Sequence, residues 1–534
     1  MVRRARKPIF WKMLQEIQKI KQEFARDDSL PKGEFSSSLE TNLNRLRNLF
    51  NESQDLIIRR FQIGEHPAAL VYVDGLIDKH EIEWSILRPL IQAREPSVIV
   101  QDDLLSGIST KLMTVVELRR TSDWEGIPEL LLNGNTLVLV HGVDESLIVN
   151  TPGWDKRALE QPDSEVTLKG PRLGFIESLR TNTALLRYYI SDPNLTFETM
   201  TIGEKTRTLV SICYLKGVAN EGLITELKRR IGRIKTDAIL AAGFVEQLIE
   251  DDPFSLFSTT GYSERPDVVA SLLLEGRAAI ITEGTPVVVT VPYLFLENFQ
   301  SPDDYNFRFI YGSLLRWFRY ISFTISLLSP AAYVALATFH QELIPTPLLI
   351  TMAEATEGTP FPSVIEILVM GLFFEILREG GIRLPKPVGQ AISIVGALVI
   401  GQATVQAGLV GAPTLIVISL TAVSSFVVPT LVDEATPLRF ILVILAGLLG
   451  AFGIMIGLLL LLIHLASLRS FGVPYLSPIA PVNLRGLAQD VIIRAPTWAM
   501  WKRPAMLAPN DPERQQFRLM PKPPSSGGEE NPKR

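Results

Sequence analysis

The sequence is poor in the residues that most often build catalytic or metal-binding sites. Its one cysteine, Cys213, has no partner for a disulfide within the chain. The five histidines lack the spacing of zinc ligands. No glycine-rich loop ends in the Lys-Ser/Thr pair of a phosphate site, and no serine lies in a nucleophile elbow. We therefore expect a protein that is not an enzyme and that holds no metal and no cofactor.

A strong charge imbalance is also missing, since a net charge of -5 over 534 residues gives no reason to expect nucleic acid binding. Charge is instead spread unevenly along the chain. Residues 317–473 are mostly apolar, whereas residues 1–316 carry many charged side chains and the sequence is polar again after residue 473. This pattern predicts a soluble part followed by a membrane part.

Three apolar stretches are long enough to cross a bilayer, which takes about 20 helical residues. Tyr320–Phe339 has this length, and Phe440–Ala466 is the clearest single span. Gly389–Thr430 has room for two crossings, with a break at GLVGAP. We expect an α-helical multi-pass membrane domain of about four to five segments over residues 301–473.

Two carboxylates lie in a fourth apolar stretch, residues 361–378. Glu366 and Glu375 would each cost at least about 2.5 kcal/mol at the centre of a bilayer. They are nine residues apart and so point to opposite faces of a helix. We expect neither to face lipid, and we expect Glu375 to pair with Arg378 one turn further on.

Lysines and arginines predict the orientation of the membrane part. Arg316 and Arg319 precede the first span, and basic residues such as Arg469 and Arg485 follow the last. Positive flanks favour the cytoplasmic side, so both ends are expected there. Five full crossings would separate the two ends, which predicts that residues 361–378 form a re-entrant or interfacial helix.

The uncharged stretch at residues 389–402 has two different helical faces. A stripe of small residues, which lets helix backbones approach closely, consists of Gly389, Ser393, Ala397 and Gly401. A second face, which could line a narrow gated pore, consists of Ala391, Val395, Leu398 and Gln402. Alternatively the helix is buried within one subunit, with Gln402 bonded to a neighbouring backbone. The spacing alone does not decide between these two interpretations.

The soluble part contains an internal repeat. LVYVDGLID at residues 70–78 and VSICYLKGVAN at residues 210–220 both read as a strand that ends near a glycine. Later, LLNGNTLVLVHG resembles LLEGRAAIITEG. Three glycine pairs share an offset of 142 residues: Gly75 with Gly217, Gly134 with Gly276, and Gly142 with Gly284. We infer two copies of one α/β module.

A joint at residues 169–190 separates the copies, and its polar side chains, including Arg180 and Arg187, are either solvated or form a contact between modules or subunits. The basic start of the chain predicts an amphipathic helix that is either solvated or on a membrane surface. The predicted parts are an N-terminal basic helical extension (1–59), α/β module 1 (60–168), a linking helix (169–202), α/β module 2 (203–300), the membrane domain (301–473), a membrane-proximal C-terminal segment (474–505) and a disordered tail (506–534).

Several long motifs resemble one protein family. They are GPRLGFIESLRTN, ERPDVVASLLLEGRAAIITEGTPVVVTVPYLF, FQSPDDY, EILREGGIRLPKPVGQAISIVGALVIGQA and LRSFGVPYLSP. Together they span most of residues 60–482. In them the chain resembles the A-type subunit of GerA-family spore germinant receptors, a family that includes a paralogue encoded in the SpoVA operon.

The resemblance implies a protein of the inner spore membrane that acts with a transporter-like B subunit and a lipoprotein C subunit. It also implies that copies of the chain oligomerise in the lipid membrane into a nutrient-gated ion channel, which releases cations from the spore. Three alternatives remain: an ion-release amplifier of the SpoVA operon, a transporter that uses Glu366 or Glu375, and a non-conducting scaffold subunit.

Overall fold

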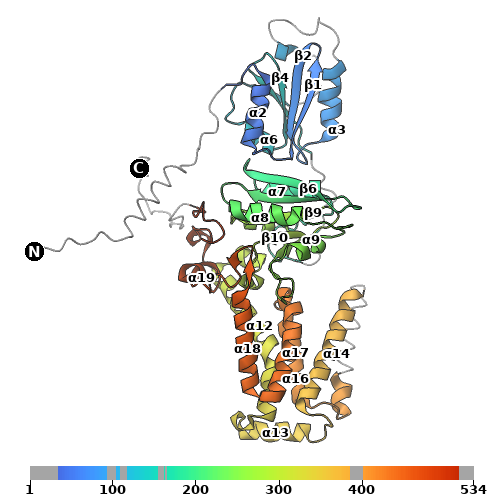
Figure 1. Ribbon diagram of the computed structural model, residues 1–534, viewed down its shortest axis with the longest axis vertical. Coiled ribbons are helices and arrows are strands. Elements are labelled where there is room, and N and C mark those ends of the chain that lie inside the picture. Colours follow the sequence, from blue (N-terminus) through green and yellow to red (C-terminus); the bar gives the residue numbers. More distant parts are fainter. Residues whose placement is uncertain are drawn as a thin grey trace, which may run out of the picture.

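The computed structural model describes residues 34–92, 104–108, 113, 117–153, 161–162, 165–384 and 401–515. Two α/β modules are stacked on one end of a helical bundle along the long axis of the molecule (Figure 1). The predicted N-terminal helix within residues 1–33 lies outside the described residues, as does the tail from residue 516.

The first module is a five-stranded antiparallel sheet covered by helices on both faces (Figure 1). The strand order is β1-β2-β4-β5-β3. Its elements are α2 (Leu39–Leu49), β1 (Leu56–Ile63), β2 (His66–Val73), α3 (Lys79–Glu81), η1 (Ile82–Leu87), α4 (Arg88–Gln92), α5 (Leu104–Gly107), β3 (Leu118–Thr121), α6 (Ile127–Leu132), β4 (Asn135–Val140) and β5 (Ser146–Asn150).

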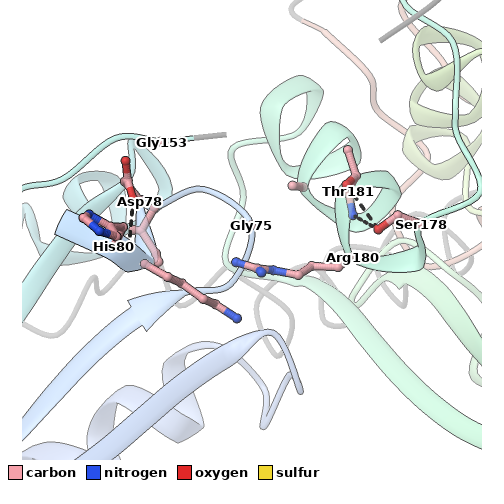
Figure 2. A pocket seen from close by; sticks show the side chains of 10 residues that line it. Gly75, Asp78, His80, Gly153, Ser178, Arg180 and Thr181 are labelled. Atoms are coloured by element: carbon pink, nitrogen blue, oxygen red, sulfur yellow. Dashed lines mark hydrogen bonds between the residues drawn. The ribbon is translucent and has the colours of Figure 1, made fainter. Parts of the chain in front are cut away.

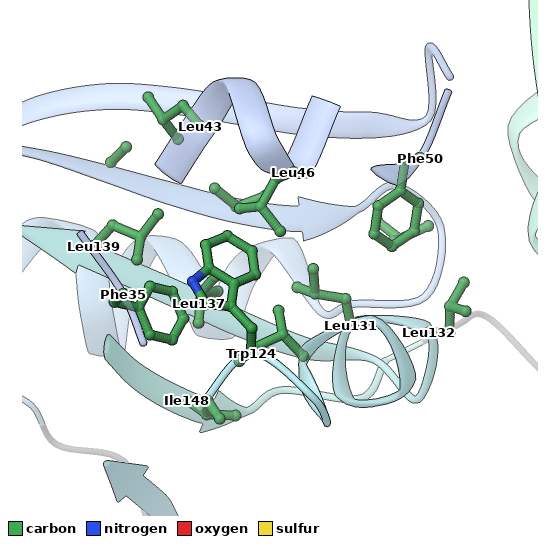
Figure 3. Packing of buried hydrophobic residues seen from close by; sticks show 14 of the residues in the cluster. Phe35, Leu43, Leu46, Phe50, Trp124, Leu131, Leu132, Leu137, Leu139 and Ile148 are labelled. Atoms are coloured by element: carbon green, nitrogen blue, oxygen red, sulfur yellow. The ribbon is translucent and has the colours of Figure 1, made fainter. Parts of the chain in front are cut away.

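One half of the core of this module lies between the sheet, α2 and α6 (Figure 3). Trp124 is fully buried there and stacks on Phe35, with ring centroids 4.5 Å apart. Leu43 and Leu46 of α2 are fully buried in the same cluster. Because α2 supplies core residues, the predicted module boundary at residue 60 is wrong, and residues 34–59 belong to the module.

The second module has the same strand order, β6-β7-β9-β10-β8. Helices α7 and α10 cover one face of its sheet, and α8 and α9 cover the other. Its elements are α7 (Leu179–Tyr189), β6 (Leu195–Ile202), β7 (Thr208–Leu215), α8 (Glu221–Gly232), α9 (Ala242–Ile249), β8 (Gly261–Ser263), α10 (Pro266–Leu274), β9 (Ala278–Thr282) and β10 (Val288–Val291). The predicted boundary at residue 203 is wrong because β6 precedes it.

The glycines of the repeat adopt matching backbone conformations. Gly75 and Gly217 have φ of 85° and 88°, and Gly134 and Gly276 have φ of 83° and 92°. These values lie in the left-handed region, which glycine adopts without steric cost. Each pair therefore holds an equivalent turn in the two sheets.

The bundle follows module 2 through a short 3-10 helix, η4 (Phe295–Phe299). Its helices are α11 (Pro302–Asn306), α12 (Phe309–Thr338), α13 (Thr346–Thr356), α14 (Ser363–Arg383), α16 (Ala412–Ser425), α17 (Val432–Leu449) and α18 (Ala451–Ser467), with single 3-10 turns at Gln341–Leu343 and Pro429–Leu431. In the described part of the chain, α12 alone is long and apolar enough to cross a bilayer as one helix. The pair Ala412–Ser425 and Pro429–Leu449 passes the same test jointly, but it is bent by 112°.

The predicted single span at Phe440–Ala466 is wrong, because the chain reverses direction at Gly450. This glycine has φ of 62° and separates α17 from α18. A Cβ at Gly453 would collide with the carbonyl of Leu445, so the two helices pack too closely for a larger residue there. The apolar run thus forms two antiparallel helices. The predicted break at GLVGAP is present, since α16 begins at Ala412.

The C-terminal segment returns from the bundle to module 2. It contains β11 (Arg469–Ser470), β12 (Val473–Pro474), α19 (Leu484–Asp490) and η7 (Thr497–Ala499). The Nε of Arg503 donates to the carbonyl of Leu274, 2.7 Å away, and Leu507 and Ala508 are buried against Gly276. The predicted disordered tail from residue 506 is therefore wrong for residues 506–515. Module 2 and this segment meet the same end of the bundle, and module 1 lies beyond module 2 on that side (Figure 1).

Candidate functional site

The predicted gate lies mostly outside the described residues, which stop at residue 384 and resume at residue 401. One residue of the predicted gate, Gln402, and one of the predicted small-residue stripe, Gly401, are described, and they have different environments. Gly401 is buried, and a Cβ there would lie 3.6 Å from the side chain of Leu415 in α16. Gln402 is exposed. At this end of the stretch the small residue packs on a neighbouring helix, and the amide faces away from the subunit's interior. Outside the described residues lie Gly389, Ala391, Ser393, Val395, Ala397 and Leu398.

Glu366 is buried inside the bundle, with 1% of its surface exposed. Its carboxylate accepts hydrogen bonds from Thr414 Oγ1 at 2.6 Å and from the backbone N–H of Gly411 at 3.3 Å. Both donors lie at the start of α16, where the helix dipole favours a negative charge. The hydroxyl of Tyr333 in α12 lies 3.2 Å from Thr414 Oγ1. Glu366 therefore joins α14 to α16 and, through Thr414, to α12.

Glu375 lies in a second polar cluster about two turns from the end of the same helix. The expected pair with Arg378 is present, at 2.8 Å. Glu375 also lies 3.4 Å from Arg439 in α17, whose guanidinium donates to the carbonyl and hydroxyl of Ser326 in α12, each at 3.0 Å. Glu375 is thus paired with two arginines inside the protein. Sequence reasoning missed Arg439, although an arginine directly before an apolar run is a recognisable signal.

A buried ionic cluster joins the start of the bundle to the C-terminal segment. Asp304 is fully buried and pairs with Arg319 at 2.7 Å and with Arg316 at 3.3 Å. Arg316 also pairs with Asp490 of the C-terminal segment at 3.1 Å, and the hydroxyl of Tyr305 donates to Asp490 at 2.8 Å. Burial raises the pKa of Asp490 to about 6. Sequence reasoning treated both arginines only as membrane flanks and missed their partners.

A second buried ion pair joins the two modules. Arg187 of α7 donates to both carboxylate oxygens of Asp55, at 2.7 and 3.1 Å, and neither side chain is more than 7% exposed. Ser53 accepts from the same guanidinium and donates to Asp55. The polar side chains of residues 169–190 were expected either to be solvated or to form a contact between modules or subunits. For Arg187 the structure shows a contact between modules.

A polar cleft of about 490 Å³ lies beside this junction (Figure 2). Module 1 contributes Asp78 and His80, and module 2 contributes Thr181 of α7 and Ser178, which caps the start of that helix. Arg180 reaches across from α7 toward module 1, where it pairs with Asp74 at 2.9 Å. The cleft therefore has walls from both sides of the joint.

Within the described ranges, no group of three or more His, Cys, Asp or Glu side chains could hold a metal ion.

By fold and site, the chain is a tandem α/β protein attached to a helical bundle, and its buried charges hold these parts together. It belongs to the GerA family: the family model described as Bacillus/Clostridium GerA spore germination protein matches residues 44–506.

Relatives match along nearly the whole chain. Spore germination protein KA of Bacillus subtilis (strain 168) is 43% identical over 498 residues, which cover 92% of this chain and 91% of that protein. Spore germination protein B1 of the same organism is 38% identical, covering 90% of this chain and all of that protein. A crystal structure of the N-terminal domain of the A subunit of the Bacillus megaterium spore germinant receptor GerK3 is 33% identical, with a TM-score of 0.39, and covers 49% of this chain and 98% of that chain.

Proposed function

We propose that this chain is an A-type subunit of a spore germinant receptor and that copies of it form a nutrient-gated ion channel, whose opening releases cations and triggers germination. The observation that carries the proposal is the contrast between Gly401 and Gln402. The small residue is packed inside the subunit and the next residue, an amide, is exposed at its surface. An uncharged helix with a packed face and a free face suits a pore that is lined by several copies.

The bundle is proposed to lie in the inner spore membrane. Large apolar side chains are exposed along α14, α16, α17 and α18. Such a surface is unfavourable in water and is expected in contact with acyl chains. Because both modules and the C-terminal segment lie at one end of the bundle, they would share one side of the membrane. The basic residues at this end favour the cytoplasmic, core-facing side.

The proposed partners follow from the family. The family model and the relatives at 43% and 38% identity are all described as spore germination proteins. We expect B-type, transporter-like and C-type, lipoprotein subunits to associate with this chain, in addition to further copies of itself. The matching strand orders and glycine turns support a duplication of the α/β module.

The transporter alternative is disfavoured by the surroundings of the two carboxylates. Glu366 already accepts two hydrogen bonds, and Glu375 is paired with two arginines. Neither group is available to carry an ion without breaking the packing of the bundle. The amplifier alternative uses the same pore with a different opening signal, so the response to nutrient distinguishes it. The scaffold alternative predicts no effect of gate residues on ion flow.

Substitutions at Val395 test the proposal in spores. Val395→Ala removes bulk from the proposed constriction, and Val395→Ser lets water enter it, so both should cause germination without nutrient. The matched control is Val423→Ser, because Val423 is exposed on the outside of α16. Protein abundance is measured in parallel. Normal protein abundance without spontaneous germination in either Val395 variant would show that Val395 does not form the gate.

A further inference from the structure

Module 2 exposes a group of large apolar side chains at its lower end, around α9 (Figure 1). We call this group the α9 apolar surface; it consists of Leu240, Phe244, Leu248, Phe254 and Leu256. Phe244 and Leu248 are four residues apart in α9 and so lie on one side of that helix, and Leu240 comes shortly before the helix begins. Phe254 is 97% exposed, which is exceptional for a phenylalanine side chain. A cluster of this kind on a soluble module marks a contact surface.

The loop that carries Phe254 rests on the end of the bundle. Ser255 Oγ lies 3.0 Å from His464 Nε2 in the last turn of α18, and the rings of Phe257 and His464 lie 6.4 Å apart. Helical side chains lean toward the N-terminus of their helix. His464 therefore points toward the middle of the bundle, and the loop meets α18 below its end.

The outer surface of the bundle near His464 is apolar. Leu459, Leu460, Leu462 and Ile463 of α18 are exposed. Arg469 lies two residues beyond the end of α18 and is also exposed. Under the proposed membrane placement, Arg469 marks the headgroup level. Phe254 then lies at the boundary between headgroups and acyl chains.

We propose that the α9 apolar surface inserts into the interfacial layer of the lipid bilayer, with Phe254 as its deepest side chain. The α9 apolar surface lies next to the exposed apolar residues of α18, at a similar depth in the proposed membrane. An apolar cluster at this depth is stabilised by contact with acyl chains. Module 2 is then held to the membrane at two places, the bundle and α9. This inference rests on the proposed membrane placement of the bundle.

Fluorescence quenching of the full chain in phosphatidylcholine–phosphatidylglycerol vesicles tests the inference. Cys213 is fully buried, so Phe254→Cys adds the one exposed thiol for an environment-sensitive fluorophore. Leu460→Cys reports on the bundle surface. Tyr188→Cys is the matched control, because Tyr188 is an aromatic residue of module 2 that is 55% exposed and lies on α7, which faces module 1. The quencher is a nitroxide on the lipid acyl chain.

The inference predicts that the label at position 254 is quenched to an extent comparable with position 460, while position 188 is not quenched. Quenching at 460 without quenching at 254 would overturn the inference and leave the membrane placement intact. In that case, protection of position 254 from a water-soluble quencher would indicate that a second copy of the chain covers the surface. No quenching at position 460 would overturn the membrane placement itself.

Discussion

At the scale of single residues, buried ion pairs connect parts of the chain that are distant in sequence. Asp55 and Arg187 join the two modules, and Asp304 and Asp490 hold Arg316 at the start of the bundle. A buried charge that loses its partner is strongly unfavourable, whereas an exposed pair contributes little. These pairs therefore fix how the parts are oriented more than they add stability.

Removal of Arg187 should loosen the joint between the modules. Arg187→Ala leaves Asp55 buried without a cation, which should lower the free energy of unfolding by about 3–5 kcal/mol. Arg180→Ala is the control, because Arg180 is 44% exposed and its pair with Asp74 should contribute about 1 kcal/mol or less. Thermal unfolding of the purified full chain measures both. Equal losses would show that the Asp55–Arg187 pair has no special role.

Asp490 predicts a pH dependence at the junction with the bundle. Burial raises its pKa to about 6, above the value of 3.8 for an unperturbed aspartate. Between these values the folded state binds the proton that the unfolded state has released, so the stabilisation from this group is fully present below 3.8 and is lost as the pH rises through about 6. Asp490→Asn should remove this step. The melting temperature of the wild type minus that of the variant, followed against pH, measures it; a difference independent of pH would contradict the assignment.

At the scale of elements, sequence patterns predicted the strands, turns and helix breaks that depend only on residues close together in the chain. The strand before Gly75 and its copy before Gly217, the paired glycines and the break before Ala412 are set by alternation and turn residues, and the structure has them, with the strands at His66–Val73 and Thr208–Leu215. The first strand of each sheet was missed. It is an edge strand, and in β1 the exposed Arg59 and Arg60 interrupt the apolar alternation.

Elements that depend on distant contacts were predicted less well. Gly450 splits an apolar run because α17 and α18 pack on each other, and run length alone could not show this. Leu507 is buried because it meets Gly276, a residue far away in sequence. At the candidate site, the spacing of Glu375 and Arg378 was informative, whereas the pairing of Asp304 with two arginines depends on how separate helices approach.

Docking of the C-terminal segment should depend on Gly276. A Cβ at Gly276 would lie 2.8 Å from the carbonyl of Leu507, and φ there is 92°. Gly284 has φ of 88° with open space around it, so Gly284→Ala carries the same backbone cost of about 1–2 kcal/mol without the clash. Gly276→Ala should therefore speed amide hydrogen exchange in residues 503–515, and Gly284→Ala should not. Similar exchange in both variants would mean that the segment tolerates the clash.

At the scale of the whole molecule, a series of contacts runs from module 1 to the bundle. Asp55–Arg187 links the modules, η4 leads out of module 2, and the Asp304 cluster holds the start of α12. The C-terminal segment binds both module 2 and α12 through Arg503 and Asp490. Under the proposed function, a change in the modules would reach the bundle through these contacts.

Cation release from potassium-loaded liposomes that contain the purified full chain tests the proposed channel most directly. A polar residue in the constriction should hold the pore open without nutrient or partner subunits, because it lets water enter. We predict that Val395→Ser releases potassium faster than the wild type, and that Val423→Ser, on the outer face of α16, does not. Equal and slow release from all three, with equal insertion into the membrane, would contradict the account of this chain as a gated channel.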